Sequence, residues 1–262
     1  MANSQAHAHA HKHAAMAIKA ANGDDFTEKN RAHWDQNART YTSQPWQQEM
    51  IARINSFLAA NAEWLGLPPR QSSSADNSNA RPIRVLDYAC GPGTVTAILG
   101  PRANEWKGID LSAEMCKMYN ERFASVPESD KALKPFTAHA TNGNLLREGG
   151  DEGFGGPEWQ GFDMVCIGLG FHHFEDLPLA TKTLVERLRP GGVFMIVDLV
   201  THEPEESTRH LVAHAGFDFE KVRGLFEGQG LQDVQWRVME EEVLIRGTMP
   251  RRVFVAKGRK PE

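Results

Sequence analysis

The sequence predicts an α/β fold with a doubly wound, mostly parallel seven-stranded sheet, a final antiparallel strand and an N-terminal helical cap. From residue 83 to residue 199, short apolar runs alternate with segments of helix length, which is the pattern of βαβ units and of a sheet covered on both faces. The chain has 262 residues, 40% of them hydrophobic, which is enough for one sizeable core. We therefore expect one main domain.

Three segments precede this core. Residues 1–25 are rich in Ala and His and predict a disordered tail, although their alternating His residues could chelate a divalent metal. Residues 26–66 have apolar side chains at helical spacing and predict a cap of one or two helices. Residues 67–82 are rich in Pro, Ser and Asn and predict a linker loop. The domain would then span 26–262, with its Rossmann-like core at 83–262.

Within the core, strands and helices are expected in turn, and two short strands joined by a polar link complete the sheet in antiparallel fashion. The expected strands are 83–89, 106–110, 136–140, 162–170, 193–199, 231–239 and 251–258. The expected helices begin at Thr94 and span 112–125, 177–188 and 218–230, with a turn at 189–192 and a hairpin link at 240–250.

Composition excludes several classes of function. The formal net charge is -5 and the isoelectric point is about 6.1, so no overall positive field favours nucleic acid or an anionic membrane. No apolar run reaches the roughly 18 residues of a membrane-spanning helix, and the start has no secretory signal. The three cysteines have no CxxC spacing and indicate reduced thiols. We expect a cytoplasmic or nuclear protein without membrane insertion.

The end of the first strand is the strongest sign of a ligand. Asp87 closes this strand, and the small residues Ala89, Gly91 and Gly93 form the following turn, where a ligand can approach the backbone closely. The acid favours a cationic ligand over a pyrophosphate. Asp110 ends the next strand, at about the distance where such folds place a carboxylate on ribose hydroxyls. Adenosine with a positive charge indicates S-adenosylmethionine.

Four ordered motifs carry a family resemblance. "VLDYACGPGTVT", "GIDLSAEM", "FDMVCIGLGFHHFED" and "LRPGGVFMIVDL" resemble the successive motifs of class I S-adenosylmethionine-dependent methyltransferases. Small-molecule enzymes of the ubiquinone-biosynthesis type are the most similar, and the Ser/Asn-rich insertion at 71–79 resembles filamentous-fungal members. The resemblance implies a Rossmann-like fold and transfer of a methyl group to an O, N, S or C atom of an acceptor. S-adenosylhomocysteine would be the product.

The resemblance also implies the residues that bind the cofactor. The turn would hold its methionine part, Asp110 its ribose, and two apolar side chains its adenine, while helix capping and core packing are the structural alternatives. The implied cofactor-binding residues are Tyr41, Asp87, Ala89, Gly91, Gly93, Asp110, Leu111, Met115, Thr141, Asn142 and Gly168. Tyr41, with Trp34 as second choice, would place an aromatic ring beside the sulfonium.

Two positions depart from the family pattern. Ala89 replaces the usual first glycine, which is tolerable if its φ is negative. The sequence "ATNGNLL" lacks the aspartate that reaches the adenine amino group in many relatives. Thr141, Asn142 or a backbone carbonyl would have to accept that hydrogen bond instead.

Methyl transfer depends largely on positioning, and a base is needed only if the acceptor holds a proton. His172 follows the fourth strand, where the acceptor is expected, and is the preferred catalytic base. His173 is a weaker candidate, as are three later histidines, His202, His210 and His214. The structural alternative is that this segment only turns the chain and that one imidazole caps the helix beside Asp176. No metal site is expected in the domain.

The acceptor is not identified by the sequence, and a small molecule is preferred. A protein substrate is the alternative, because acidic residues such as Glu203, Glu205 and Glu206 could meet a basic peptide. A second alternative is the regulatory subunit of a methyltransferase heterodimer, suggested by the departures from the family pattern. The partner expected is therefore a small-molecule acceptor, with a homodimer or a heterodimer with a second methyltransferase as further options.

Overall fold

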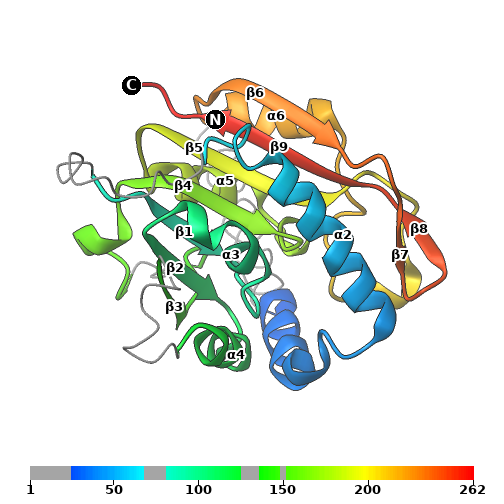
Figure 1. Ribbon diagram of the computed structural model, residues 1–262. Coiled ribbons are helices and arrows are strands. Elements are labelled where there is room, and N and C mark those ends of the chain that lie inside the picture. Colours follow the sequence, from blue (N-terminus) through cyan, green and yellow to red (C-terminus); the bar gives the residue numbers. More distant parts are fainter. Residues whose placement is uncertain (1–24, 68–80, 125–135, 148–151) are drawn as a thin grey trace, which may run out of the picture.

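A computed structural model describes residues 25–67, 81–124, 136–147 and 152–262. Its centre is a seven-stranded sheet with the order β3-β2-β1-β4-β5-β9-β6, in which β9 is antiparallel to both neighbours and the other strands are parallel to one another (Figure 1). The strands are β1 (Arg84–Tyr88), β2 (Glu105–Asp110), β3 (Thr137–Asn142), β4 (Phe162–Gly168), β5 (Leu188–Leu199), β6 (Gln232–Val238) and β9 (Val253–Arg259). The predicted fold class is confirmed.

Both faces of the sheet are covered, as β5 shows directly. Its side chains alternate, so that Phe194 and Ile196 enter one hydrophobic cluster while Val193, Met195 and Val197 enter the other. Helices α2 (Pro45–Asn61) and α3 (Thr94–Leu99) pack on one face, and α5 (Leu177–Glu186) and α6 (Phe219–Glu227) pack on the other (Figure 1). Helix α4 (Ala113–Phe123) packs against β2 and β3. Central strands are therefore apolar on both sides, which explains their nearly continuous apolar sequences.

The predicted cap consists of two helices. The first spans residues 25–37 and is called the N-terminal helix below; a 3-10 turn, η1 (Ala38–Thr40), follows it. Helix α2 begins at Pro45, whose fixed φ suits the first helical position. The side chain of Gln47 accepts a hydrogen bond from the Gln44 backbone N–H at 3.0 Å and so closes the start of α2. The predicted tail and linker fall, apart from their ends, on residues 1–24 and 68–80, which lie outside the described residues.

One local prediction is wrong, and the predicted hairpin link, which joins the antiparallel pair β6 and β9, contains an additional small sheet. The segment at 189–192 is not a turn before a strand but part of β5, which begins at Leu188. This is possible because Gly191 adopts φ 70, and its N–H donates to the carbonyl of Lys260 at 3.0 Å, next to β9. The link at 240–250 is not a simple connection either. It folds into its own two-stranded sheet, β7 (Val243–Ile245) with β8 (Met249–Arg251), which packs beside α2 (Figure 1).

The topology fixes where a ligand can bind. The chain runs outward from β1 through β2 to β3 and then returns to β4 on the other side of β1. In open α/β sheets, ligands bind outside the carboxyl ends of the strands at such a switch point. The short 3-10 elements lie in the loops: η3 (Gly100–Arg102), η5 (Pro157–Trp159), η6 (Phe171–His173) and η7 (Glu206–Thr208). Among the described helices, none combines the length and apolar character needed to cross a membrane.

Candidate functional site

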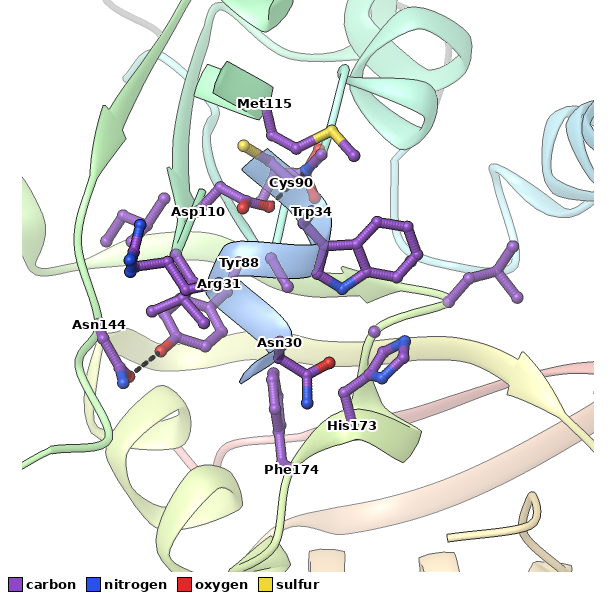
Figure 2. A pocket seen from close by; sticks show the side chains of 18 of the residues that line it. Asn30, Arg31, Trp34, Tyr88, Cys90, Asp110, Met115, Asn144, His173 and Phe174 are labelled. Atoms are coloured by element: carbon purple, nitrogen blue, oxygen red, sulfur yellow. Dashed lines mark hydrogen bonds between the residues drawn. The ribbon is translucent and has the colours of Figure 1, made fainter. Parts of the chain in front are cut away.

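A cavity of about 1110 Å³ opens at the carboxyl ends of β1, β2 and β4, and the N-terminal helix forms its opposite wall (Figure 2). It exceeds the roughly 300–1,000 Å³ of a typical small-molecule pocket, which suits two ligands side by side. The predicted residues that line it are Tyr41, Asp87, Ala89, Gly91, Asp110, Leu111, Met115 and Gly168, and Trp34 lines it too. The predicted residues that do not line it are Gly93, Thr141, Asn142 and His172.

Asp110 joins two turns at the edge of this cavity. Its Oδ2 accepts a hydrogen bond from the Gly91 backbone N–H at 2.8 Å, and its Oδ1 accepts one from the Ser112 N–H at 2.8 Å. Burial raises the pKa of the carboxyl to about 6, although both of these hydrogen bonds lower it. Each oxygen keeps a further lone pair. The carboxylate can therefore accept two neighbouring hydroxyl groups, as the predicted ribose contact requires.

Asp87 lies deeper, at the end of β1, with only 1% of its surface exposed. Its Oδ2 accepts a hydrogen bond from the Thr96 hydroxyl at 2.8 Å, while its Oδ1 has no hydrogen-bond partner among the described residues. Burial raises the pKa of this carboxyl to about 7. A buried acceptor without a partner is costly, so a ligand with a positive charge or a donor is favoured beside it. Neither acid caps a helix: Gly93 precedes α3, and Ser112 caps α4.

The turn after β1 differs from the expectation at its first small residue. Ala89 has φ 55, so the condition of a negative φ is not met, and an alanine occupies a left-handed conformation that costs roughly 1–2 kcal/mol. Gly91 has φ 50, and a Cβ built on it would meet nothing within 4 Å, which leaves the ligand side of the turn open. Gly93 has φ 80, and its Cβ would lie 2.4 Å from the ring of Phe123 and 2.9 Å from that of Tyr119. Gly93 therefore allows the start of α3 to pack closely against α4, and it does not line the cavity.

The two polar residues expected at the adenine, Thr141 and Asn142, do not line the cavity. The amide nitrogen of Asn142 donates to the backbone carbonyls of Asp110 at 3.0 Å and Leu111 at 2.9 Å, so it supports the turn after β2. The cavity is lined instead by Asn144, two residues further along the chain. Asn144 Oδ1 accepts a hydrogen bond from the Tyr88 hydroxyl at 3.1 Å (Figure 2). The sequence pattern alone contains no signal for Asn144.

The N-terminal helix is tied to the rest of the site by Asp35. Its Oδ1 accepts a hydrogen bond from the Ser112 hydroxyl at 2.6 Å, and its Oδ2 pairs with the Arg31 guanidinium at 2.6 Å. Trp34, on the same helix, packs edge to face with Tyr41, with ring centroids 5.6 Å apart. Because the Ser112 backbone N–H also donates to Asp110, Ser112 connects the N-terminal helix to the acid that is predicted to bind the ribose. Asp35 was not among the residues identified from the sequence.

The two adjacent histidines have different surroundings. His172, the predicted base, lies outside the cavity lining; its Nδ1 is 2.7 Å from Oδ1 of the buried Asp198, and its backbone N–H donates to Oδ2 of the same carboxylate. His173 lines the cavity, with Nδ1 2.7 Å from the carbonyl of Leu211. Burial, together with the neighbouring His172, lowers the pKa of His173 to about 3. Asp176, not an imidazole, caps α5 through the Leu179 N–H. The role of His172 as catalytic base stays a prediction. Its position outside the cavity lining does not favour that role.

The other histidines considered as acceptor-site residues, His202, His210 and His214, do not line the cavity. Apolar and aromatic side chains form one part of its wall, although charged residues such as Arg31, Arg147 and Glu175 also line the cavity. Phe174 packs edge to face with Tyr88, with ring centroids 5.8 Å apart, and Leu179 lies on the first turn of α5. This part of the cavity is suited to an apolar molecule.

Comparison with known proteins assigns the chain to a family. A model described as a methyltransferase domain matches residues 48–236. The chain belongs to this methyltransferase family. It is 28% identical over 164 residues to an uncharacterized methyltransferase of Schizosaccharomyces pombe, covering 58% of this chain and 55% of that protein. It is 27% identical over 184 residues to a demethylmenaquinone methyltransferase of Staphylococcus aureus, covering 67% of this chain and 64% of that protein. The methyltransferase thus spans less than two thirds of these curated relatives.

Solved structures show the same fold. Phosphoethanolamine N-methyltransferase 2 of Haemonchus contortus, in complex with S-adenosyl-L-methionine, matches with a TM-score of 0.52 and 14% identity, over 86% of this chain and 60% of that one. The class I methyltransferase fold implies S-adenosylmethionine as the cofactor. The residues present fit it: Asp110 offers two acceptor oxygens, Asp87 has an unpartnered buried oxygen, and Gly91 leaves its side of the turn open.

The ribose contact is testable by substitution. Asp110→Ala should weaken S-adenosylmethionine binding by about 1.5–3 kcal/mol, the range for hydrogen bonds to a charged group. Calorimetry measures the affinity, and thermal melts show whether the variant is folded. Asp163→Ala is the matched control, because Asp163 also accepts a backbone N–H, from Arg84, but does not line the cavity. A folded Asp110→Ala protein with unchanged affinity would contradict the ribose assignment.

The raised pKa values of Asp87 and Asp110 predict proton release on binding. A nearby sulfonium and hydroxyl donors favour the ionised carboxylates, so binding lowers both pKa values from about 7 and about 6. Protons should therefore be released at pH 6.5, and little should be released at pH 8, where both groups are already ionised. Calorimetry in two buffers with different ionisation enthalpies measures this. Asp87→Asn should reduce the release at pH 6.5, and equal release at both pH values would be evidence against the assignment.

Proposed function

We propose that this chain transfers the methyl group of S-adenosylmethionine to a small-molecule acceptor. The observation that carries the proposal is that one cavity joins the turns after β1 and β2, which carry Asp87 and Asp110, to a compartment lined by Tyr88, Phe174 and Leu179 beneath the N-terminal helix. A similarity to a demethylmenaquinone methyltransferase supports an acceptor of small size. We also propose that Asp87, Asp110 and Gly91 contact the cofactor. Leu111 and Met115 lie beside its adenine, as the family resemblance implies.

An enclosed acceptor site favours a small molecule over a protein. The N-terminal helix closes the cavity on the side away from the sheet, held there by the Asp35–Ser112 hydrogen bond. The acidic residues considered for a basic peptide lie elsewhere: Glu205 pairs with Arg251 at 2.8 Å and Glu206 with Arg209 at 3.4 Å, and neither lines the cavity. A protein substrate, a regulatory heterodimer and the cellular compartment stay predictions from the sequence.

Positioning is the main contribution expected from the protein. The bound cofactor supplies an electrophilic methyl group on a sulfonium, and an acceptor atom held in line with it needs little further chemistry. Trp34 and Tyr41 cover the cavity with aromatic surface, which excludes water and can attract the positive charge. Asp87 and Asp110 would hold the two ends of the cofactor in register with the acceptor compartment.

Neither of the two adjacent histidines is suited to act as a general base, although the carboxylates of Glu175 and Asp176 also line the cavity. With a pKa of about 3, His173 is too weak a base to hold a proton near neutral pH. His172 is oriented by Asp198 in the manner of an acid–histidine pair, but its ring lies behind that of His173, with centroids 4.2 Å apart. We therefore propose that the acceptor reacts without losing a proton, or loses it to water or to a lining carboxylate and not to a histidine.

Labelled transfer tests the function directly. The full chain is incubated with methyl-labelled S-adenosylmethionine and either a panel of hydroxylated, aminated and thiol-bearing ring compounds or Lys/Arg-rich peptides. Label is expected in the ring compounds and not in the peptides. Asp110→Ala should reduce the transfer, since it weakens cofactor binding. Label found in the peptides alone would favour the protein-substrate alternative, and label in neither would contradict the proposal.

His172→Asn separates a base from a structural residue. Since its ring is outside the cavity lining, we expect turnover within about tenfold of the unmodified chain and the same pH profile; a lost general base would cost 10²–10⁴-fold. Turnover is measured with the acceptor found above, together with cofactor affinity and thermal melts. A loss of a hundredfold or more, with the acid limb of the pH profile removed and affinity unchanged, would restore His172 as the base.

A further inference from the structure

Asn30 is a buried polar residue of the cavity wall whose acceptor atom is unused. Only 5% of its surface is exposed. Its amide nitrogen donates to the Phe26 carbonyl at 3.3 Å, one turn earlier in the N-terminal helix, which fixes the orientation of the amide. Its Oδ1 has no hydrogen-bond partner in the described part of the chain. Buried carboxamide oxygens are normally paired, so this one marks a place for a ligand donor.

His173 presents a second acceptor to the same compartment. A carbonyl oxygen can only accept, so the contact of Nδ1 with the Leu211 carbonyl at 2.7 Å places the ring proton on Nδ1. The neutral ring then has its lone pair on Nε2. His173 comes from η6, after β4, whereas Asn30 comes from the N-terminal helix, so the two acceptors are held by independent parts of the fold.

Asn30 and His173 lie near one another in the cavity wall. Asn30 and Trp34 are four residues apart on the N-terminal helix and share one helical face. The Trp34 ring is edge to face with the His173 imidazole, with centroids 5.6 Å apart. Figure 2 shows the Asn30 carboxamide oxygen on the side of His173, with Phe174 below both. All four residues line the cavity.

We propose that Asn30 Oδ1 and His173 Nε2 form a paired acceptor subsite for the methyl acceptor, which is then an apolar ring compound with two neighbouring O–H or N–H donors. This inference rests on the proposed function, because it names the substrate class of the same cavity. Phe174, Tyr88 and Leu179 supply the apolar surface for the ring. A site with buried acceptors rejects molecules that lack the donors, because their binding would leave those acceptors unpaired.

Binding of matched probes tests the subsite without turnover. Ligand-detected NMR, in the presence of S-adenosylhomocysteine, compares 4,5-dimethylcatechol, 4,5-dimethyl-1,2-phenylenediamine and 1,2-dimethoxy-4,5-dimethylbenzene, which has no donor. The full chain should bind at least one donor probe more tightly than the dimethoxy compound. The catechol and the diamine distinguish O–H from N–H recognition. Equal or weaker binding of both donor probes, or no measurable binding of either, would overturn the proposal.

Variants of Asn30 and His173 test whether these two acceptors cause the tighter binding of the donor probes. Asn30→Leu should lower the donor-to-dimethoxy affinity ratio by about 2–13-fold, the factor for one neutral hydrogen bond. His173→Leu should lower it by a similar factor from the other element, which keeps the test valid if one variant does not fold. Asn55→Leu is the matched control, since Asn55 Oδ1 is also buried and unpartnered but Asn55 does not line the cavity.

A failure of the acceptor subsite can be distinguished from a failure of the proposed function. S-adenosylhomocysteine affinity, measured separately for each protein, should be unchanged in all three variants. If the unmodified chain does not bind S-adenosylhomocysteine, the cofactor proposal fails, whereas the probe ratios still report on the subsite. A ratio that is the same in Asn30→Leu, His173→Leu and Asn55→Leu would contradict the paired acceptors even if the chain methylates a small molecule.

Discussion

The hydrogen bonds of Asp110 determine how the site is assembled. One carboxylate oxygen binds the turn after β1 through the Gly91 N–H, and the other binds the turn after β2 through the Ser112 N–H. The Ser112 hydroxyl then binds Asp35 on the N-terminal helix. Three segments far apart in the sequence are thereby positioned around one buried acid. The cavity exists because these segments meet at the carboxyl ends of parallel strands, where the strand order reverses.

The same arrangement leaves two buried polar atoms in the cavity wall that have no hydrogen-bond partner in the described part of the chain. Asp87 has an unpartnered oxygen and a raised pKa, and Asn30, which lines the same cavity from the N-terminal helix, also has an unpartnered oxygen. Both atoms lie where a ligand would supply what is missing: a positive charge or donor at Asp87, and a neutral donor at Asn30. Two buried oxygens without hydrogen-bond partners in one cavity fit a reaction that needs two bound molecules, a cofactor and an acceptor.

The sheet could be predicted from the sequence because the patterns that indicate strands and helices are local. Asp87 and Asp110 could be identified because each lies at the end of a predicted strand. It was insufficient where contacts are long-range. Nothing adjacent to Asp35 indicates a hydrogen bond to Ser112, which lies 77 residues away. The positive φ of Ala89 depends on how β1 connects to α3 and could not be deduced from residue type. His172 and His173 are indistinguishable in sequence, and only the packing of η6 places the second one in the cavity.

The central claim is that this cavity binds S-adenosylmethionine with its ribose on Asp110. A crystal structure of the full chain with S-adenosylhomocysteine tests it most directly, since the product has the same ribose and amino-acid parts. Both ribose hydroxyls should lie within hydrogen-bonding distance of the Asp110 carboxylate, and the amino-acid part should lie along the turn between Asp87 and Gly91. A ligand bound away from Asp110, or one whose ribose faces solvent, would contradict it.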